Sequence, residues 1–284
     1  MTRTQLSKLL IVGLALPALF VPAGCLVYIL FKGLPALSWS FIFSATEGTG
    51  FGASSGILAQ LLGSLLLALA ASLVATPFAL GTAFYYRLYA SPRQQRLLVG
   101  LLNMLQSIPP IVFGLFGLVV FVHFLQWGVS LLSGAVILAL VILPMLVLNS
   151  IASLERIPRE YTEAAQSLGL KHSAVIGRVW LGQAWPGILT GQLLAMARAL
   201  SETAPILFTA TVFSGVIWPA SIFSPVTTLQ THIFYLAQEG NNQEVTQIAW
   251  GSAVVLLAAV AGFSLLARRL SSWSDKARVI TSEE

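Results

Sequence analysis

Charged side chains are scarce in this sequence of 284 residues. Asp, Glu, Lys and Arg make up 9% of the chain, whereas 57% of it is apolar and the mean hydropathy is +0.86. A soluble domain carries about 25% charged residues. Because so few charges cannot solvate a globule of this size, most of the surface must face lipid. The sequence therefore predicts an all-α integral membrane protein, since its apolar runs are continuous and lack the alternation of a β-barrel.

Cysteine and histidine are also rare. Cys25 is the only cysteine, so no internal disulfide is possible. The three histidines, His123, His172 and His232, are far apart in the sequence and form no metal-binding pair. The chain also lacks the Gly-x-x-x-x-Gly-Lys-Ser/Thr loop that binds nucleotide phosphates. These absences argue against a membrane-embedded enzyme and predict that any nucleotide chemistry lies on a partner.

Six apolar runs are long enough to cross a bilayer, which takes about 20 residues each. The predicted spans cover residues 9–31, 57–86, 97–125, 129–150, 188–213 and 247–267. We divide the chain into a first span with its outer loop (1–56), a core of five spans (57–267) and a tail (268–284). A polar segment, 151–187, lies inside the core, and a second one, 214–246, has a candidate surface helix at 227–238.

The cations lie almost entirely on one side of this arrangement. Thirteen of the 15 Lys and Arg residues fall at the termini and in alternate connections, the opposite connections hold only Lys32, and Arg198 lies within a span. By the positive-inside rule, both termini are cytoplasmic. Because the basic residues flank spans, the net charge of +5 indicates membrane orientation and argues against nucleic-acid binding.

Two ionisable residues lie inside the fifth predicted span. Arg198 stands about 15 Å beyond the start of this span, and Glu202 follows four residues later on the same predicted helical face. A charge at this depth is expensive unless it faces the bundle interior or a wet cavity. A guanidinium fits the oxygens of phosphate or carboxylate. The pair therefore predicts an anion path, and the alternative is an ion pair that only fixes the rotation of the helix.

A double proline interrupts the third predicted span. Pro109 and Pro110 cannot donate backbone hydrogen bonds, and Ile108 is pushed away from helical geometry. The sequence predicts a break there, with free N–H groups from Ile111 onward that favour an anion. A kink whose polar groups are satisfied by neighbouring helices is the alternative.

The polar segment 151–187 predicts a short helix on the cytoplasmic side. Residues 161–168 favour a helix, Pro158 suits its start and Gly169 suits its end. Glu163, Ala164 and Ala165, followed after three residues by Gly169, are similar to the EAA loop of ABC importer permeases. The resemblance implies that this loop is the coupling helix, which seats in a groove of an ATPase subunit.

Two further stretches narrow the resemblance. Residues 197–210 and 108–117 are similar to the permease family of the phosphate-specific ABC importer, with Ser201 where that family typically has Gly. The resemblance covers roughly residues 56–267. It implies that Arg198 and Glu202 lie in the phosphate path. Beside them we expect Ser201, Thr203, Pro109 and Pro110.

The resemblance further implies a type I ABC importer permease fold in the bacterial cytoplasmic (inner) membrane. The expected partners are a homologous sister permease, two cytoplasmic ATPase subunits and a periplasmic or extracytoplasmic phosphate-binding protein. The chain would form half of the pore and would be a transport subunit, not an enzyme. No cofactor is expected on it, because ATP and Mg²⁺ would sit on the ATPase subunits.

Three other functions remain open from the sequence. A permease for sulfate, molybdate or an amino acid would share most of these features. A secondary transporter working alone would leave the EAA-like loop unexplained. A membrane-embedded enzyme is the least compatible, because the spans contain no paired acidic residues at helical spacing.

Overall fold

The computed structural model describes residues 3–44, 56–212, 218–239 and 242–283. Within these residues the chain is helical, apart from one isolated parallel bridge between Thr211 and Val226. Part of the predicted outer loop in 1–56, the end of the predicted fifth span at residue 213 and parts of segment 214–246 lie outside the described residues.

Twelve α-helices and three short helical stretches follow one another along the described chain. They are α1 (Arg3–Gly33), η1 (Leu34–Ala36), α2 (Trp39–Phe43), α3 (Leu58–Leu88), α4 (Pro92–Ser107), α5 (Pro110–Gly117), η2 (Leu118–Phe124), α6 (Leu131–Glu155), α7 (Arg159–Ser167), α8 (His172–Ala174), η3 (Val175–Trp180), α9 (Leu181–Ser201), α10 (Ala204–Leu207), α11 (Leu229–Gln238) and α12 (Gln243–Glu283).

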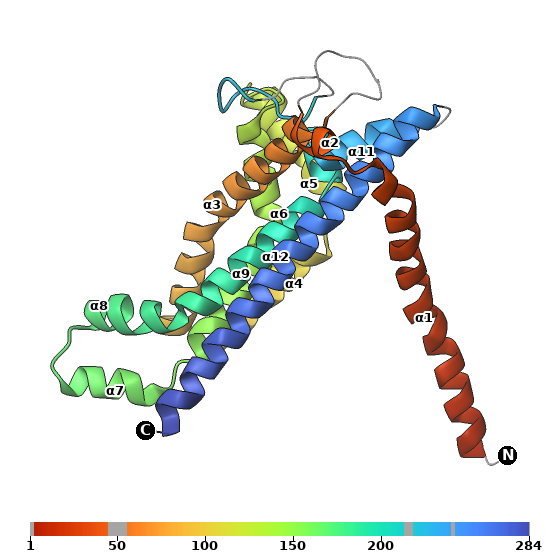
Figure 1. Cartoon of the computed structure of the whole chain (residues 1–284). Helices are drawn as coiled ribbons and strands as arrows, with labels where there is room; N and C mark the ends of the chain where they lie inside the picture. Colours follow the sequence, from red (N-terminus) through yellow and green to blue (C-terminus); the bar gives the residue numbers. More distant parts are fainter. Residues whose placement is uncertain (1–2, 45–55, 213–217, 240–241, 284) are drawn as a thin grey trace.

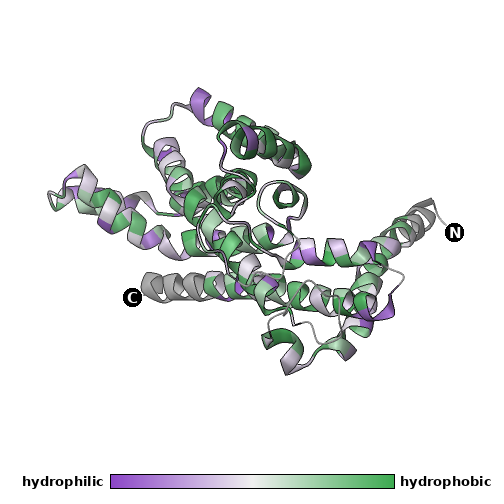
Figure 2. Ribbon diagram, turned by 90° about the horizontal axis from the view of Figure 1, so that it is seen from above, coloured by the Kyte–Doolittle hydropathy of each residue, from purple (hydrophilic) through white to green (hydrophobic). Residues whose placement is uncertain are grey.

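The long helices α3, α6, α9 and α12 form the bundle (Figure 1). Helix α6 packs along α3 and α9, and α12 packs along α9. Seen from above, the bundle ribbons are mostly hydrophobic (Figure 2). Helix α1 diverges from the bundle, and residues 11–28 are exposed along its length. It contacts α12 at its upper end, where Gly33 approaches Trp250.

Small side chains allow the bundle helices to approach closely. On α3, buried alanines recur every three or four residues, which places them on one helical face; they are Ala68, Ala71, Ala75, Ala79 and Ala83. Lipid supplies no hydrophobic drive between helices, so close van der Waals contact between small residues stabilises such bundles. This face of α3 is therefore the one that packs in the bundle core.

Four membrane crossings among the described residues are supported by length and composition, and a fifth is supported if one bent helix pair is counted as a single span. Four described helices are each long and apolar enough to span: α1, α3, α6 and α12. The pair α4 and α5–η2 makes a fifth span if the two bent pieces count as one. Helix α9, which holds most of the predicted fifth span, does not meet the same criterion. The predicted count of six spans therefore stays a prediction.

The predicted break at the double proline is confirmed. Helix α4 ends at Ser107, Ile108 has an extended backbone (φ −69°, ψ 126°) and α5 begins at Pro110. The two helical pieces are bent by 85° relative to each other. The helix predicted at 227–238 is also confirmed as α11.

Gly134 of α6 tests how tightly the bundle is packed. A β-carbon there would lie 2.2 Å from Cβ of Ala210, whereas a β-carbon at Gly81 of α3 would meet nothing within 4 Å. We expect Gly134→Ala to destabilise the protein by about 1–3 kcal/mol through overpacking. Gly81→Ala is the matched control and should stabilise by about 0.5–1 kcal/mol. Thermal unfolding of both variants in detergent measures the difference, and equal melting temperatures would contradict this packing.

Candidate functional site

The residues predicted to line an anion path gather where α9 ends. The helix stops at Ser201, Glu202 is extended (φ −91°, ψ 122°) and α10 begins at Ala204. Pro205 has no N–H, so the carbonyl of Ser201 cannot receive the hydrogen bond that would continue the helix. The expectation of one continuous span over 188–213 was therefore wrong, and Glu202 lies just past the helix instead of on its face.

Arg198 and Glu202 form an ion pair across this helix end. Nε of Arg198 lies 3.5 Å from Oε1 of Glu202, and the two side chains are 32% and 16% exposed. This distance exceeds the usual 2.7–3.2 Å of a hydrogen bond. Nε is buried and makes no hydrogen bond to any described residue. The carboxylate thus balances the charge but leaves Nε of the guanidinium without a hydrogen-bond partner among the described residues.

The backbone of α9 adds to this arrangement. Arg198 lies in the last turn, where the carbonyls that have no donor within the helix carry partial negative charge that stabilises a cation. One of these carbonyls, that of Leu200, accepts a hydrogen bond from Nε2 of Gln230 at 2.7 Å. Oε1 of Gln230 in turn accepts from the Ser64 hydroxyl at 2.9 Å. Helix α11 and helix α3 therefore fix the position at which α9 ends.

Gln230 was missed by the sequence analysis. It lies in the segment 214–246, which looks like an ordinary outer connection, and a buried glutamine there has no local sequence signature. The interruption of α9 did have a signal, because Pro205 stands within the predicted span.

The two proline-marked breaks meet in space. Helix α5, which begins at the first break, packs against α10, which begins at the second. A β-carbon at Gly114 of α5 would lie 2.9 Å from Cα of Pro205 and 3.0 Å from the carbonyl oxygen of Ala204. Only glycine permits so close an approach. The structure thus brings the start of α5, with Pro109 and Pro110, to the element that follows Glu202.

Several polar groups of the other predicted path residues form hydrogen bonds with nearby backbone groups. The Ser201 hydroxyl donates to the carbonyl of Ala197 at 2.9 Å. The carbonyl of Thr203 accepts from the N–H of Leu207 at 3.1 Å, and the N–H of Val112 donates to Pro109 at 2.9 Å. Among the predicted path residues, Arg198 has a buried side-chain donor, Nε, that makes no hydrogen bond to any described residue.

The depth of Arg198 within the bundle can be measured from the end of the uncharged run of α12. Residues 245–267 contain no charged side chain, so Arg268 marks the polar edge of that span. Arg268 and Thr190 of α9 line the same pocket and thus lie at similar height. Arg198 is eight residues further along α9, which is about 12 Å. It lies inside a hydrocarbon layer of about 30 Å, although α9 begins at Leu181 and not at residue 188.

The helix predicted over residues 161–168 is present as α7, Arg159–Ser167. It ends at Ser167, and Gly169 follows with φ +75°, a left-handed conformation that favours glycine. The N–H of Gly169 donates to the carbonyl of Gln166 at 2.9 Å, and the N–H of Leu170 donates to that of Ala165 at 3.1 Å. These two bonds form a Schellman motif, which stops the helix. The role predicted for Gly169 as a helix terminator is confirmed.

Helix α7 has one inner and one outer face. Ala165 is buried, and the Thr162 hydroxyl accepts a hydrogen bond from Nε1 of Trp180 at 3.0 Å. Glu163 and Ala164 are exposed. Leu168, which the sequence analysis did not single out, is 83% exposed next to them. The exposed Glu163, Ala164 and Leu168 therefore form one accessible patch at this helix.

Helix α7 lies at the same end of the molecule as the start of α1 and the end of α12, whereas α2 and α11 lie at the opposite end (Figure 1). This arrangement agrees with the grouping of cations along the sequence. Among the described residues, no cluster of three or more His, Cys, Asp or Glu residues forms a metal site.

Comparison with known proteins identifies the family to which the chain is similar. Residues 75–279 match the model of the family described as binding-protein-dependent transport system inner membrane component. The chain is 31% identical to the probable ABC transporter permease protein YqgI of Bacillus subtilis, over 88% of each chain. It is 32% identical to the phosphate transport system permease protein PstA of Pasteurella multocida, over 93% of this chain and 94% of that one.

Solved structures show the same architecture. A bacterial alginate ABC transporter, solved in complex with an alginate-bound periplasmic protein, aligns with a TM-score of 0.62 over 94% of this chain and 93% of its own. The inward-facing MetNI methionine ABC transporter aligns with a TM-score of 0.58 over 76% and 94%. Sequence identities are 13% and 14%, so these likenesses show the fold alone.

Gln230 tests whether the end of α9 depends on its buried hydrogen bonds. In Gln230→Leu the carbonyl of Leu200 loses its donor inside the protein, which we expect to destabilise by about 1–3 kcal/mol. Gln238→Leu on the same helix is the control, because Gln238 is exposed and bonds only to its own helix. Thermal unfolding in detergent measures both variants. A Gln230→Leu melting temperature equal to that of the control would show that the contact is dispensable.

Proposed function

Because the chain belongs to the family of binding-protein-dependent transport system inner membrane components, we propose that it forms half of the translocation pore of an ATP-driven phosphate importer. Its fold is that of a type I ABC importer permease, and it is a transport subunit, not an enzyme. The observation that carries the proposal is the Arg198 guanidinium, which lies within α9 and whose buried Nε makes no hydrogen bond to any described residue. The similarity to phosphate permeases over most of the chain supports the choice of substrate.

Arg198 binds the passing anion in this proposal. Its planar guanidinium can donate two parallel hydrogen bonds to phosphate oxygens. Glu202, 3.5 Å away, offsets part of the positive charge, so the anion is held weakly enough to leave. Ser201 and Thr203 flank the pair, and the break at Pro109 and Pro110 opens the opposite wall of the path.

Helix α7 couples this path to ATP hydrolysis. Glu163 and Ala164 face outward and contact the ATPase subunit, together with Leu168. Ala165 and Gly169 act differently, because burial of the first and the left-handed turn of the second shape the helix. Of the four motif residues, two thus serve docking and two serve the geometry of the docking element.

A continuous helical route joins α7 to Arg198. Trp180 bonds to Thr162 of α7 and ends η3, which continues directly into α9. Arg198 is eighteen residues further on, about 27 Å along this helix. A displacement of α7 on closure of the ATPase dimer is therefore transmitted to the helix end that carries the anion ligand. This linkage provides for alternating access.

The remaining assembly follows from the same proposal. The chain lies in the bacterial inner membrane with α7 and both termini in the cytoplasm. It pairs with a homologous sister permease, two ATPase subunits that hold ATP and Mg²⁺, and an extracytoplasmic phosphate-binding protein. Uptake of radiolabelled phosphate by the reconstituted complex, with sulfate and molybdate as competitors, tests the substrate.

Arg198→Lys tests the planar donor pair. Lysine keeps the charge and loses the fork, so we expect phosphate uptake to fall about 10- to 100-fold, the equivalent of losing one charge-assisted hydrogen bond of about 1.5–3 kcal/mol. Radiolabelled phosphate uptake measures the effect, with transporter amount fixed by immunoblot. Uptake at the wild-type rate would rule out bidentate recognition by this residue.

Glu163→Arg tests docking on α7. Reversal of an exposed charge at the contact should remove the ATPase subunits from the purified complex and abolish ATP-driven uptake, while membrane insertion stays normal. Glu239→Arg is the control, because this exposed glutamate follows α11 at the opposite end of the molecule. Co-purification through a tag on this chain measures the result. The coupling role would be refuted if the ATPase subunits were recovered equally with both variants.

A further inference from the structure

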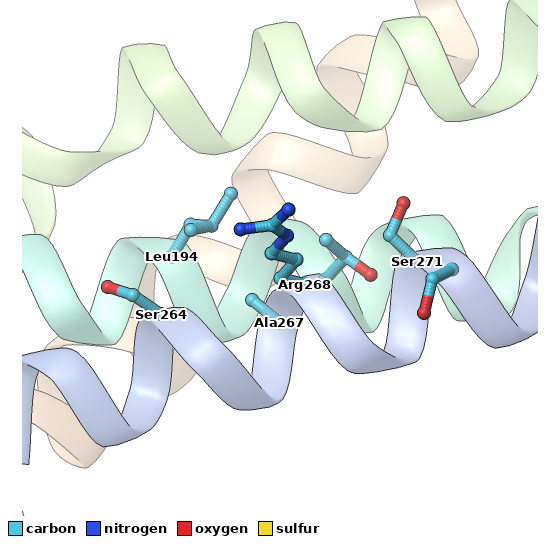
Figure 3. Close-up of a pocket in the computed structure, with 7 residues that line it drawn as sticks. Leu194, Ser264, Ala267, Arg268 and Ser271 are labelled. Atoms are coloured by element: carbon cyan, nitrogen blue, oxygen red, sulfur yellow. The ribbon is translucent and has the colours of Figure 1, made fainter.

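A pocket of about 360 Å³ lies between α9 and α12, away from the Arg198–Glu202 pair. Thr190 and Leu194 line it from α9, and the α12 residues include Arg268 and Ser271. Figure 3 shows the Arg268 guanidinium lying toward α9 beside Leu194, with Ser264 and Ser271 one turn away on either side. The pocket therefore combines a cation with apolar walls.

The pocket lies where lipid headgroups meet the protein. The uncharged run 245–267 of α12 is about 34 Å long, enough to cross the hydrocarbon layer of about 30 Å. Arg268 is the first charged residue after it. Leu265 and Leu266, three and two residues before Arg268, are 59% and 55% exposed, as expected for side chains that face acyl chains.

Two groups of the pocket can donate hydrogen bonds to an anion. Arg268 forms no ion pair or hydrogen bond with any side chain that the structure describes, and neither does Ser271. The other hydroxyls already donate to their own helices: Thr190 to Pro186 at 2.8 Å, Ser264 to Val260 at 2.8 Å and Ser272 to Arg269 at 2.9 Å. A phosphate group would therefore be bound by Arg268 and Ser271.

The charge around the pocket favours an anionic ligand. Residues 268–278 carry four cations, Arg268, Arg269, Lys276 and Arg278, and one acid, Asp275. Basic pockets between membrane helices on the cytoplasmic side bind phospholipid headgroups. We propose that this pocket binds the phosphate group of an anionic phospholipid, whose acyl chains lie over Leu194 and the exposed face of α12. A free phosphate ion would use the same two donors but would gain nothing from the apolar walls.

The test uses the assembled transporter, purified in detergent and depleted of lipid. Thermal unfolding is followed while phosphatidylglycerol, phosphatidylcholine or inorganic phosphate is added. We expect phosphatidylglycerol to raise the melting temperature of the wild type more than the other two. In Arg268→Gln the phosphatidylglycerol concentration for half of the shift should rise about fivefold, the equivalent of about 1 kcal/mol for one cation at a membrane surface. Arg269→Gln, a neighbouring exposed arginine outside the pocket, should respond like the wild type.

Three results would overturn the proposal. Equal responses of the Arg268→Gln and Arg269→Gln variants would indicate diffuse attraction instead of a site. A shift by inorganic phosphate that Arg268→Gln abolishes would indicate a free-anion site. The Ser271→Leu variant fills the pocket with an apolar side chain. An unchanged response of this variant to phosphatidylglycerol would show that lipid does not enter the pocket. The same variant provides the test if Arg268→Gln fails to assemble.

Discussion

One partly buried ion pair, between Arg198 and Glu202, constrains the rest of this structure. A charge within a span is tolerated only where another charge or a wet cavity compensates it. Here Oε1 of Glu202 lies 3.5 Å from Nε of Arg198, close enough to offset the charge but without a hydrogen bond to Nε. The partial negative charge at the C-terminal end of α9 also stabilises the Arg198 cation. The protein thus keeps a cation within an apolar bundle without a hydrogen bond between Nε of Arg198 and Glu202.

Prolines make this site possible by interrupting two helices at neighbouring places. Pro205 ends the continuity of α9, and Pro109 with Pro110 separates α4 from α5 by a bend of 85°. Broken helices free backbone groups, which lipid cannot satisfy. The structure meets this demand from outside the spans, because Gln230 of α11 donates to the carbonyl of Leu200. The outer helix is therefore part of the site's support.

Helix α7 and the end of α9 are linked through η3. The Trp180 indole joins α7 to η3, and α9 follows without a break up to Ser201. The Arg87 guanidinium lies 5.6 Å from the Trp180 ring and adds the end of α3 to this junction. The contacts at Trp180 therefore hold the ends of α3, α7 and α9 together.

The sequence by itself determined the membrane class, the apolar spans, the break at Pro109 and Pro110 and the end of α7 at Gly169, because hydropathy, proline and glycine act locally along the chain. It also brought Arg198 and Glu202 within reach of each other, through spacing alone. Only the tertiary structure decided that α5 meets α10 and that Gln230 supports the end of α9. Those features depend on contacts between segments far apart in the sequence, which no local pattern encodes.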